Sequence, residues 1–402
     1  MNGAAARRLR TAATGLRSAG DGTVTLLAVV LAFAAGAFVI AVSDDAVLES
    51  WGDVATDPLG AIEETVATVA DAYWALIRGA ILDPQGASLE AVLSPLSETV
   101  VTATPLMLSG LAVTLAFRAG LFNIGGQGQA VMGAAAAAFV GFHFNLAPGI
   151  HLAAALAAGI LAGAVWGGVP GWLKGRTGAH EVITTIMLNY VATILIVYLL
   201  AHETFRREGR ADAISPLVRP DARLPHLLGG DLRLHAGLLV ALAAAAAVGW
   251  LLARTTAGFE LRATGLNLRA AETAGMRPAR VYLVAMAVAG GLAGLAGATQ
   301  MLGTDFTLTP GVATGIGFTG ISVALLGRAT VKGTVAASLL FGGLQAGGIQ
   351  MQASTGTPVD LVTIIQGLIV LFIAAPLLVR SVFRLRAADA SPVAASTARG
   401  WS

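Results

Sequence analysis

The chain alternates long hydrophobic runs with short polar segments, a pattern that predicts several membrane-spanning helices. Many of the runs reach the ~20 apolar residues that cross a hydrocarbon core about 30 Å thick. Ten spans follow from this pattern, at residues 24–42, 99–117, 130–147, 150–172, 182–200, 235–252, 281–302, 311–327, 333–350 and 360–379. The sequence therefore predicts an all-α polytopic membrane protein.

Glycine interrupts this hydrophobic pattern in two places, at residues 118–129 and 311–320. A glycine weakens a helix by roughly 1 kcal/mol relative to alanine. In lipid, the backbone groups freed by such a break must bond to protein or face a water-filled cavity. Paired interruptions indicate broken or re-entrant helices, a solute site between them, and a possible internal repeat of five helices. A short interfacial loop is the alternative for the first segment.

Charge placement predicts the orientation of the chain, because arginine and lysine concentrate on the cytoplasmic side. Four arginines precede the first span, so we expect a cytoplasmic N-terminus at 1–23 and an uncleaved signal-anchor helix at 24–42. Residues 43–98 contain eleven acidic side chains and one arginine, which favours an extracytoplasmic insert lying as short surface helices. A polytopic domain at 99–380 and a cytoplasmic tail at 381–402, disordered from about Ala387, complete the expected organisation.

One loop departs from this charge pattern. Residues 202–233 are predicted to face outward but contain six arginines, offset by five acidic residues. Long loops translocate largely regardless of charge, so the predicted orientation is retained, with both termini inside.

Composition supports the membrane assignment and excludes several kinds of chemistry. Hydrophobic residues make up 56% of the chain and charged residues 12%, and the mean hydropathy is +0.76. No cysteine is present, so thiolate catalysis and cysteine metal sites are excluded. The six histidines show no metal-ligand spacing, and no catalytic constellation is apparent. Arginine predominates over lysine without indicating nucleic-acid binding. We expect neither an enzyme nor a cofactor site.

Neutral polar residues near the first interruption are the candidate substrate-pathway residues. They are the amides Asn123, Gln127 and Gln129 and, on the fifth predicted span, Thr184, Thr185 and Asn189. Amides and hydroxyls suit an uncharged, hydroxyl-rich solute. The residues of the fifth span are equally explained as interhelical hydrogen bonds. Glu181 precedes them and is either functional or an interfacial anchor paired with a nearby base.

The predicted cytoplasmic loop at 254–280 is the second distinctive feature. It reads as two short helices around a turn, with a face of small residues that could seat in a groove on a soluble partner. An ordinary solvated basic loop is the alternative. The candidate coupling residues are Arg262, Gly265, Asn267, Ala271, Glu272 and Gly275.

Four segments carry a family resemblance. They are FRAGLFNIGGQGQ at 117–129, EVITTIMLNY at 181–190, GLNLRAAETAG at 265–275 and GFTGISVALLGR at 317–328. In this order they resemble the inner-membrane permease subunits of bacterial ABC importers for nucleosides and simple sugars, which are related to branched-chain amino acid permeases. The resemblance covers about residues 95–380. Family members often carry a glutamate where this chain has Gln127, which removes a charge from that segment.

The resemblance implies a division of labour among subunits. A partner ATPase would hydrolyse ATP, since the chain has no Gly-Lys pair and therefore no P-loop. A second permease, forming a heterodimer, and an extracytoplasmic substrate-binding lipoprotein would complete the importer in the bacterial plasma membrane. The 254–280 loop would couple ATPase closure to helix movement.

Two alternative functions remain open. One is an ion-coupled secondary transporter, which broken helices also fit but which should carry acidic residues in its later spans. Only Asp360 lies there, at the border of the last predicted span. The other is an ABC permease for branched-chain amino acids.

Overall fold

The computed structural model describes residues 21–229 and 232–384. Nearly all of the predicted N-terminal segment 1–23 and tail 381–402 lies outside this part of the chain. The described residues form helices and an isolated bridge between His226 and His235, and no strand is present among them. The fold is therefore all-α, as the hydrophobic pattern predicts.

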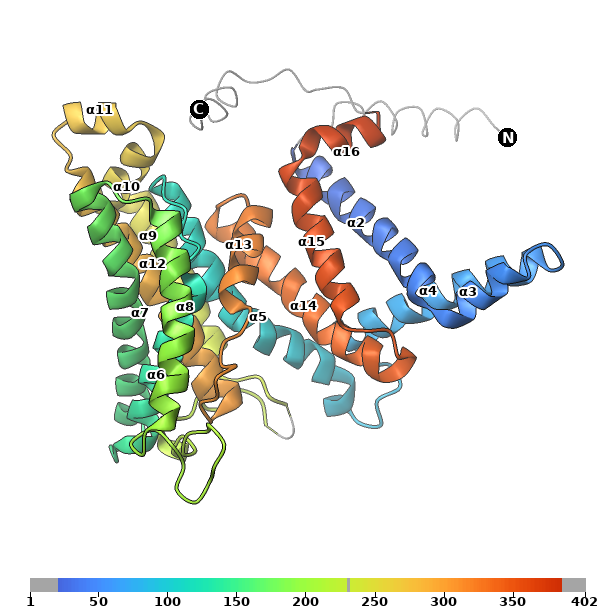
Figure 1. Cartoon of the computed structure of the whole chain (residues 1–402), viewed down its shortest axis with the longest axis horizontal. Helices are drawn as coiled ribbons and strands as arrows, with labels where there is room; N and C mark the ends of the chain where they lie inside the picture. Colours follow the sequence, from blue (N-terminus) through green and yellow to red (C-terminus); the bar gives the residue numbers. More distant parts are fainter. Residues whose placement is uncertain (1–20, 230–231, 385–402) are drawn as a thin grey trace. The chain divides into compact units, whose positions relative to one another are not determined.

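Figure 1 shows the helices in chain order. They are α2 (Asp21–Ser43), α3 (Asp45–Gly52), α4 (Pro58–Ala80), α5 (Leu89–Arg118), α6 (Gly126–His143), α7 (Ile150–Thr177), α8 (Glu181–Ala201), η1 (Pro220–Ala222), α9 (Gly237–Arg254), α10 (Thr256–Leu266), α11 (Leu268–Thr273), α12 (Pro278–Gln300), η2 (Met301–Asp305), α13 (Ile316–Leu326), α14 (Val331–Thr355), α15 (Asp360–Ala374) and α16 (Pro376–Val382).

The chain divides into two compact units, residues 1–71 with 360–402, and residues 72–359. In the first unit α2 packs along α15 and α16, and Val24, Ala28 and Val379 are buried between them. A bend of 92° separates α15 from α16. Pro376 is the first residue of α16, a position that tolerates proline because its missing N–H would have no helical partner.

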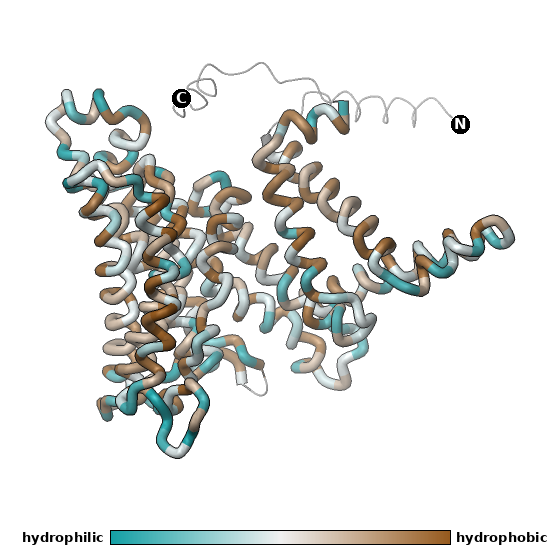
Figure 2. Tube along the Cα trace, viewed as in Figure 1, coloured by the Kyte–Doolittle hydropathy of each residue, from teal (hydrophilic) through white to brown (hydrophobic). Residues whose placement is uncertain are grey.

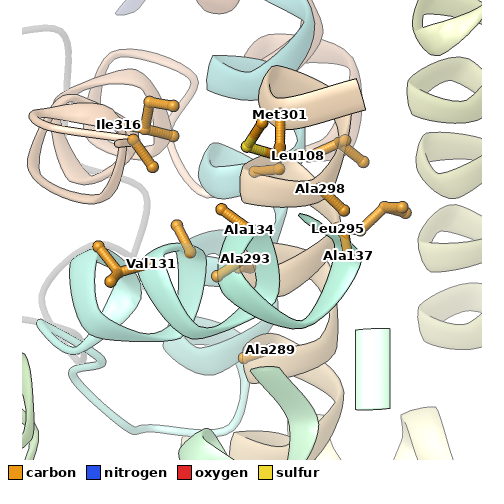
Figure 3. Packing of buried hydrophobic residues seen from close by; sticks show 14 of the residues in the cluster. Leu108, Val131, Ala134, Ala137, Ala289, Ala293, Leu295, Ala298, Met301 and Ile316 are labelled. Atoms are coloured by element: carbon orange, nitrogen blue, oxygen red, sulfur yellow. The ribbon is translucent and has the colours of Figure 1, made fainter. Parts of the chain in front are cut away.

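The second unit is built around α5, in which 83% of the residues in the most apolar stretch are buried. Helices α6, α9, α12, α13 and α14 all contact it. Alanines and glycines let these helices approach closely, as membrane bundles require in the absence of a hydrophobic force between helices. Figure 3 shows Ala134 and Ala137 of α6 packed near Ala293 and Ala298 of α12.

Helices α7 and α12 form the tightest pair through facing glycines. A methyl group added to Gly167 would lie 2.5 Å from the carbonyl oxygen of Met286, and one added to Gly171 would lie 2.7 Å from that of Tyr282. The backbones therefore touch without intervening side chains. On α12, a methyl group added to Gly290 would lie 2.9 Å from Gly167 Cα, so glycines on both helices serve this close packing.

Within the part of the chain that the structure describes, six helices are long and apolar enough to cross a membrane, or seven if the bent pair α15–α16 counts as one span. The six are α2, α5, α7, α8, α9 and α12, the last extended through η2. The predicted count of ten and the five-helix repeat are therefore not confirmed. Helices α6 and α14 contain many glycines and glutamines. Helix α13 has only 11 residues, because residues 311–315 form a turn instead of its first turns.

The acidic insert is more helical than expected. Instead of short helices alone, it contains α3 and the 23-residue α4, and α5 begins ten residues before the predicted span. Leu59, Ile62, Val66 and Trp74 are exposed along α4. Acidic neighbours interrupt this stripe in the sequence, which explains why the hydropathy pattern did not predict a helix of this length.

Within the second unit, α10 and α11 lie at one end of the bundle and the loop between α8 and α9 lies at the opposite end (Figure 1). Figure 2 shows hydrophobic residues along α8 and hydrophilic residues in both end regions. The loop is anchored to the turn after α12, since Ser215 N donates to Leu308 O at 3.0 Å and Leu224 N donates to Leu302 O at 2.9 Å. The α10–α11 segment and the loop between α8 and α9 therefore lie at opposite ends of the bundle, as expected for segments joined by one spanning helix, α9.

Candidate substrate pathway and coupling loop

The first glycine-rich segment begins with a sharp helix end. Helix α5 stops at Arg118, and Gly120 has a φ of 71°, a left-handed conformation that glycine adopts at little cost. Leu121 N donates to Ala116 O at 3.0 Å, which closes the helix end. The chain then remains non-helical until Gly126. The predicted break between the two hydrophobic runs is therefore a real elbow of the backbone.

Two of the predicted amides bond to each other inside this elbow. Asn123 Nδ2 donates to Gln129 Oε1 at 3.0 Å, and Gln129 Nε2 donates to Asn123 Oδ1 at 3.1 Å. Asn123 Oδ1 also accepts from Gly125 N at 3.0 Å. Both side chains are buried, and their polar atoms are hydrogen-bonded, as buried polar groups usually are.

Asn189 joins the elbow to α8. Its Oδ1 accepts from Gly128 N at 2.8 Å, and its Nδ2 donates to Ile124 O at 3.0 Å. The contact at Gly128 is close, because a methyl group at this position would lie 3.0 Å from Asn189 Oδ1. The Asn189 side chain therefore makes hydrogen bonds to two backbone groups at the break between the helices.

Gln127 joins the elbow to the second broken segment. Its Nε2 donates to Ala313 O at 2.8 Å, and Gly317 N donates to its Oε1 at 3.2 Å. Ala313 and Gly315 have φ values of 56° and 83°, so a strained turn precedes α13. The two glycine-interrupted segments predicted from the sequence thus meet, and one amide side chain bridges them.

The two threonines differ in their surroundings. Thr185 is buried, and a methyl group on Gly125 would lie 2.9 Å from its Cβ, so it lies beside the elbow. Thr184 is partly exposed and its hydroxyl donates to Glu181 O at 3.0 Å. The structure brings Thr185 and Asn189 together with the amides but leaves Thr184 on another face of α8.

Glu181 lies where α7, α8 and the elbow meet. Its carboxylate pairs with Lys174 Nζ at 2.5 Å and accepts from Phe122 N at 3.5 Å. The side chain is 9% exposed. These contacts match the anchoring role considered for this residue, and they also attach it to the elbow.

The predicted coupling residues lie on a helix–turn–helix. Asn267 separates α10 from α11 and caps α11, since its Oδ1 accepts from Ala270 N at 3.1 Å. Ala271 is buried, whereas Glu272 is exposed. Gly275 has a φ of 84° and ends the turn with open space around it. The predicted two-helix shape of this loop is confirmed.

Gly265 brings this loop against the elbow after α5. A methyl group on Gly120 would lie 3.0 Å from Gly265 Cα, so the two glycines lie against each other through their backbones. Arg262, one turn before Gly265, donates from Nε to Gly258 O at 3.3 Å. The loop and the glycine-rich segment are therefore in direct contact.

Several residues of this region were not predicted from the sequence. Ser109 of α5 is fully buried, and its hydroxyl has no partner among the described residues. A methyl group on Gly320 would lie 2.8 Å from Ser109 Cβ, so Ser109 separates α5 from α13. Arg118 Nε donates to Ala329 O at 2.8 Å. A serine within an apolar span and an arginine at its end are common, so neither residue type indicates these contacts.

The arrangement contains few fixed charges. In residues 21–229 and 232–384, no group of three or more His, Asp or Glu side chains could hold a metal ion. The polar groups that meet at the elbow are amides, hydroxyls and backbone, with the Lys174–Glu181 pair at its edge. Such groups exchange hydrogen bonds with uncharged solutes or water.

Membrane-length helices joined through two interrupted segments, with neutral amides between them, define a multi-pass membrane protein of the transporter class. Residues 96–374 match the family described as branched-chain amino acid transport system / permease component. This match covers well over half of the chain, and the chain belongs to this family.

Similar proteins include ABC transporter permeases from three organisms. The guanosine ABC transporter permease protein NupP of Bacillus subtilis is 37% identical over 89% of this chain and 94% of its own length. The glucose permease TsgB13 of Haloferax volcanii is 38% identical over 69% of this chain and 75% of its own. The nucleoside permease NupB of Lactococcus lactis is 34% identical over 69% and 79%.

A second permease from each of these organisms also matches, at 26, 28 and 23% identity. No solved structure shows a significant match to the chain.

Proposed function

We propose that this chain forms the translocation pathway of an ABC importer for nucleosides, with simple sugars as the second candidate substrate. The observation that supports this best is the group of neutral amides at the junction of the two broken segments. Nucleosides and sugars present hydroxyls and ring heteroatoms that pair with amides. The names of the similar guanosine, nucleoside and glucose permeases agree with both substrate classes.

The amides are saturated by protein in this structure, so we assign it to a closed state of the pathway. Gln127 and Asn189 each make two hydrogen bonds to backbone groups of other segments. A solute or water would replace these bonds when the seam between α6 and residues 313–317 opens. Asn123, Gln127, Gln129, Thr185 and Asn189 are the proposed lining residues, and Thr184 is the least favoured of the predicted set.

The orientation and the partners belong to the same proposal. We place α10 and α11 in the cytoplasm, where they contact a separate ATPase that hydrolyses ATP. The loop at 202–233 and the acidic insert then face outward, toward a substrate-binding lipoprotein. A heterodimer with a second permease is favoured because two permeases of unequal similarity match in each of the three organisms.

Coupling would run through the contact between Gly265 and Gly120. Closure of the ATPase would move α10, and the backbone contact would carry that movement to the elbow. The elbow, residues 119–125, leads directly into α6, and this region is bonded to α8 and to the second broken segment. Inward and outward states would be discrete packings of these elements that ATP binding favours unequally.

Uptake of labelled guanosine, adenosine, uridine, glucose and leucine tests the proposal in cells with and without the gene. Deletion should abolish uptake of at least one nucleoside, and uptake by the intact strain should survive collapse of the proton gradient while ATP is maintained. Uptake that stops with the gradient would instead support an ion-coupled transporter. Loss of glucose uptake alone would support the sugar, and loss of leucine uptake alone would support the amino acid alternative.

A further inference from the structure

A cavity of about 220 Å³ lies between the end of α9, α10, the end of α5 and the start of α14. Its polar wall contains Arg118 and Arg262, and Thr330 and Val331 come from the first turn of α14. Leu252 and Ala253 of α9 form an apolar wall. The cavity therefore has a basic side and a hydrophobic side, and the translocation proposal uses neither.

Both guanidinium groups are held in place but lack an acidic partner. Arg118 Nε donates to Ala329 O and Arg262 Nε donates to Gly258 O, which leaves the terminal amino groups for another acceptor. No ion pair involves either arginine within the described residues. Glu260, the acidic residue of α10, lines a different cavity with Arg280. Two like charges beside one small cavity repel each other, and an anion between them removes that repulsion.

The surroundings increase the positive potential of this cavity. Arg254 directly follows the lining residue Ala253 in the sequence, and Lys332 directly follows Val331. The 25-residue α14 begins here, and a helix N-terminus carries partial positive charge. A phosphate group has the charge and the acceptor geometry that arginines recognise best.

The apolar wall distinguishes a lipid from a free phosphate. Helix α9 is a membrane-length helix with exposed hydrophobic side chains such as Leu239, Leu242 and Trp250, so its outer face lies in hydrocarbon. Ala253 is one turn from Gly249 on this helix, and both line the cavity. An acyl chain could follow α9 while its headgroup enters between the arginines.

We propose that this cavity binds the phosphate headgroup of an anionic phospholipid from the inner leaflet. The proposal rests on the proposed cytoplasmic side for α10 and α11. Basic pockets between helices on that side favour anionic headgroups. Because Arg118 precedes the Gly120 elbow and Arg262 lies on α10, the bound lipid would join the coupling loop to the glycine-rich segment.

Lipid binding to the purified full-length permease, in detergent and without ATP or substrate, tests this proposal separately from transport. Native mass spectrometry would count retained phosphatidylglycerol and phosphatidylcholine, and thermal unfolding would be followed with each lipid and with inorganic phosphate alone. We expect phosphatidylglycerol alone to be retained and to raise the unfolding temperature. Arg262→Gln should weaken its retention about fivefold or more. Arg269→Gln, which removes an exposed charge of α11, is the matched control and should retain the lipid.

Four outcomes would overturn the assignment. Equal weakening by both variants would indicate general surface electrostatics, and equal retention of phosphatidylcholine would remove the headgroup requirement. Protection by inorganic phosphate without retained lipid would identify a free-anion site. Normal lipid retention by Arg262→Gln, with weaker binding of the ATPase subunit, would assign the cavity to the protein interface.

Discussion

The substitution Gly265→Ala tests whether the coupling loop acts on the elbow after α5. A methyl group at position 265 would lie 2.7 Å from Gly120 N and 2.9 Å from the carbonyl carbon of Ala119. These are backbone atoms that cannot rotate away, so α10 and the elbow must separate. Overpacking of this kind costs roughly 1–3 kcal/mol. If the contact exists in only one transport state, that cost shifts the balance between states by about 5–150-fold.

The assay is uptake per ATP hydrolysed, measured on the importer reconstituted in liposomes with its ATPase and binding protein. We expect Gly265→Ala to insert and assemble normally, to keep basal ATP hydrolysis, and to lose uptake by about 5–150-fold. Gly367→Ala in α15 is the matched control, because open space surrounds that glycine. Wild-type uptake by an assembled Gly265→Ala importer would refute the coupling route.

Three further predictions concern stability and pH, each followed as thermal unfolding in detergent. Gln127→Leu should destabilise the protein by roughly 1–3 kcal/mol per orphaned backbone group, since both of its bonds to the second broken segment are lost. Asn189→Ala should be similarly destabilising, whereas Thr184→Ala, whose hydroxyl bonds only its own helix, should be nearly neutral. Burial, with smaller contributions from nearby positive charges, lowers the pKa of His235 to about 4. Stability should therefore fall as pH drops from about 6.5 to 4, because the unfolded chain binds the proton first, and His235→Gln should flatten this profile.

Hydrophobic runs located the long helices because a lipid-facing helix must be apolar around most of its surface. In the most apolar stretches of α7 and α8, only 28% and 22% of the residues are buried. The first residue of each helix was predicted to within a few positions. The length of α4 was not predicted, because its apolar stripe shares the sequence with acidic residues. The turn at 311–315 was read as part of a span, since nothing in composition shows that Ala313 takes a positive φ.

The residue types at the candidate site were predictable, but their partners were not. Glycines and amides in one short segment indicated a break with polar side chains, and Asn123 and Gln129 do meet there. That Gln127 reaches a segment 186 residues later could not be read from spacing. The contact between Gly265 and Gly120 was likewise hidden, because it joins two backbones and leaves no side-chain signature.

The contrast between two helix contacts indicates where the bundle opens. Between α7 and α12, facing glycines bring the backbones together along several turns, and any sliding would drive a backbone atom into a neighbouring one. Between α6 and the second broken segment, the backbones meet at one glycine, since a methyl group on Gly317 would clash with Gln127 Cα, and the polar attachment is the pair of hydrogen bonds made by Gln127. Each such bond contributes only about 0.5–1.5 kcal/mol net, because water or a solute replaces it when it breaks. A charged pair at this position would have to lose its water each time the seam closes, which costs several kcal/mol for each ion. A neutral amide at position 127 therefore suits a seam that opens and closes repeatedly, and we infer that movement of the elbow separates α6 from residues 313–317 while α7 and α12 move as one body.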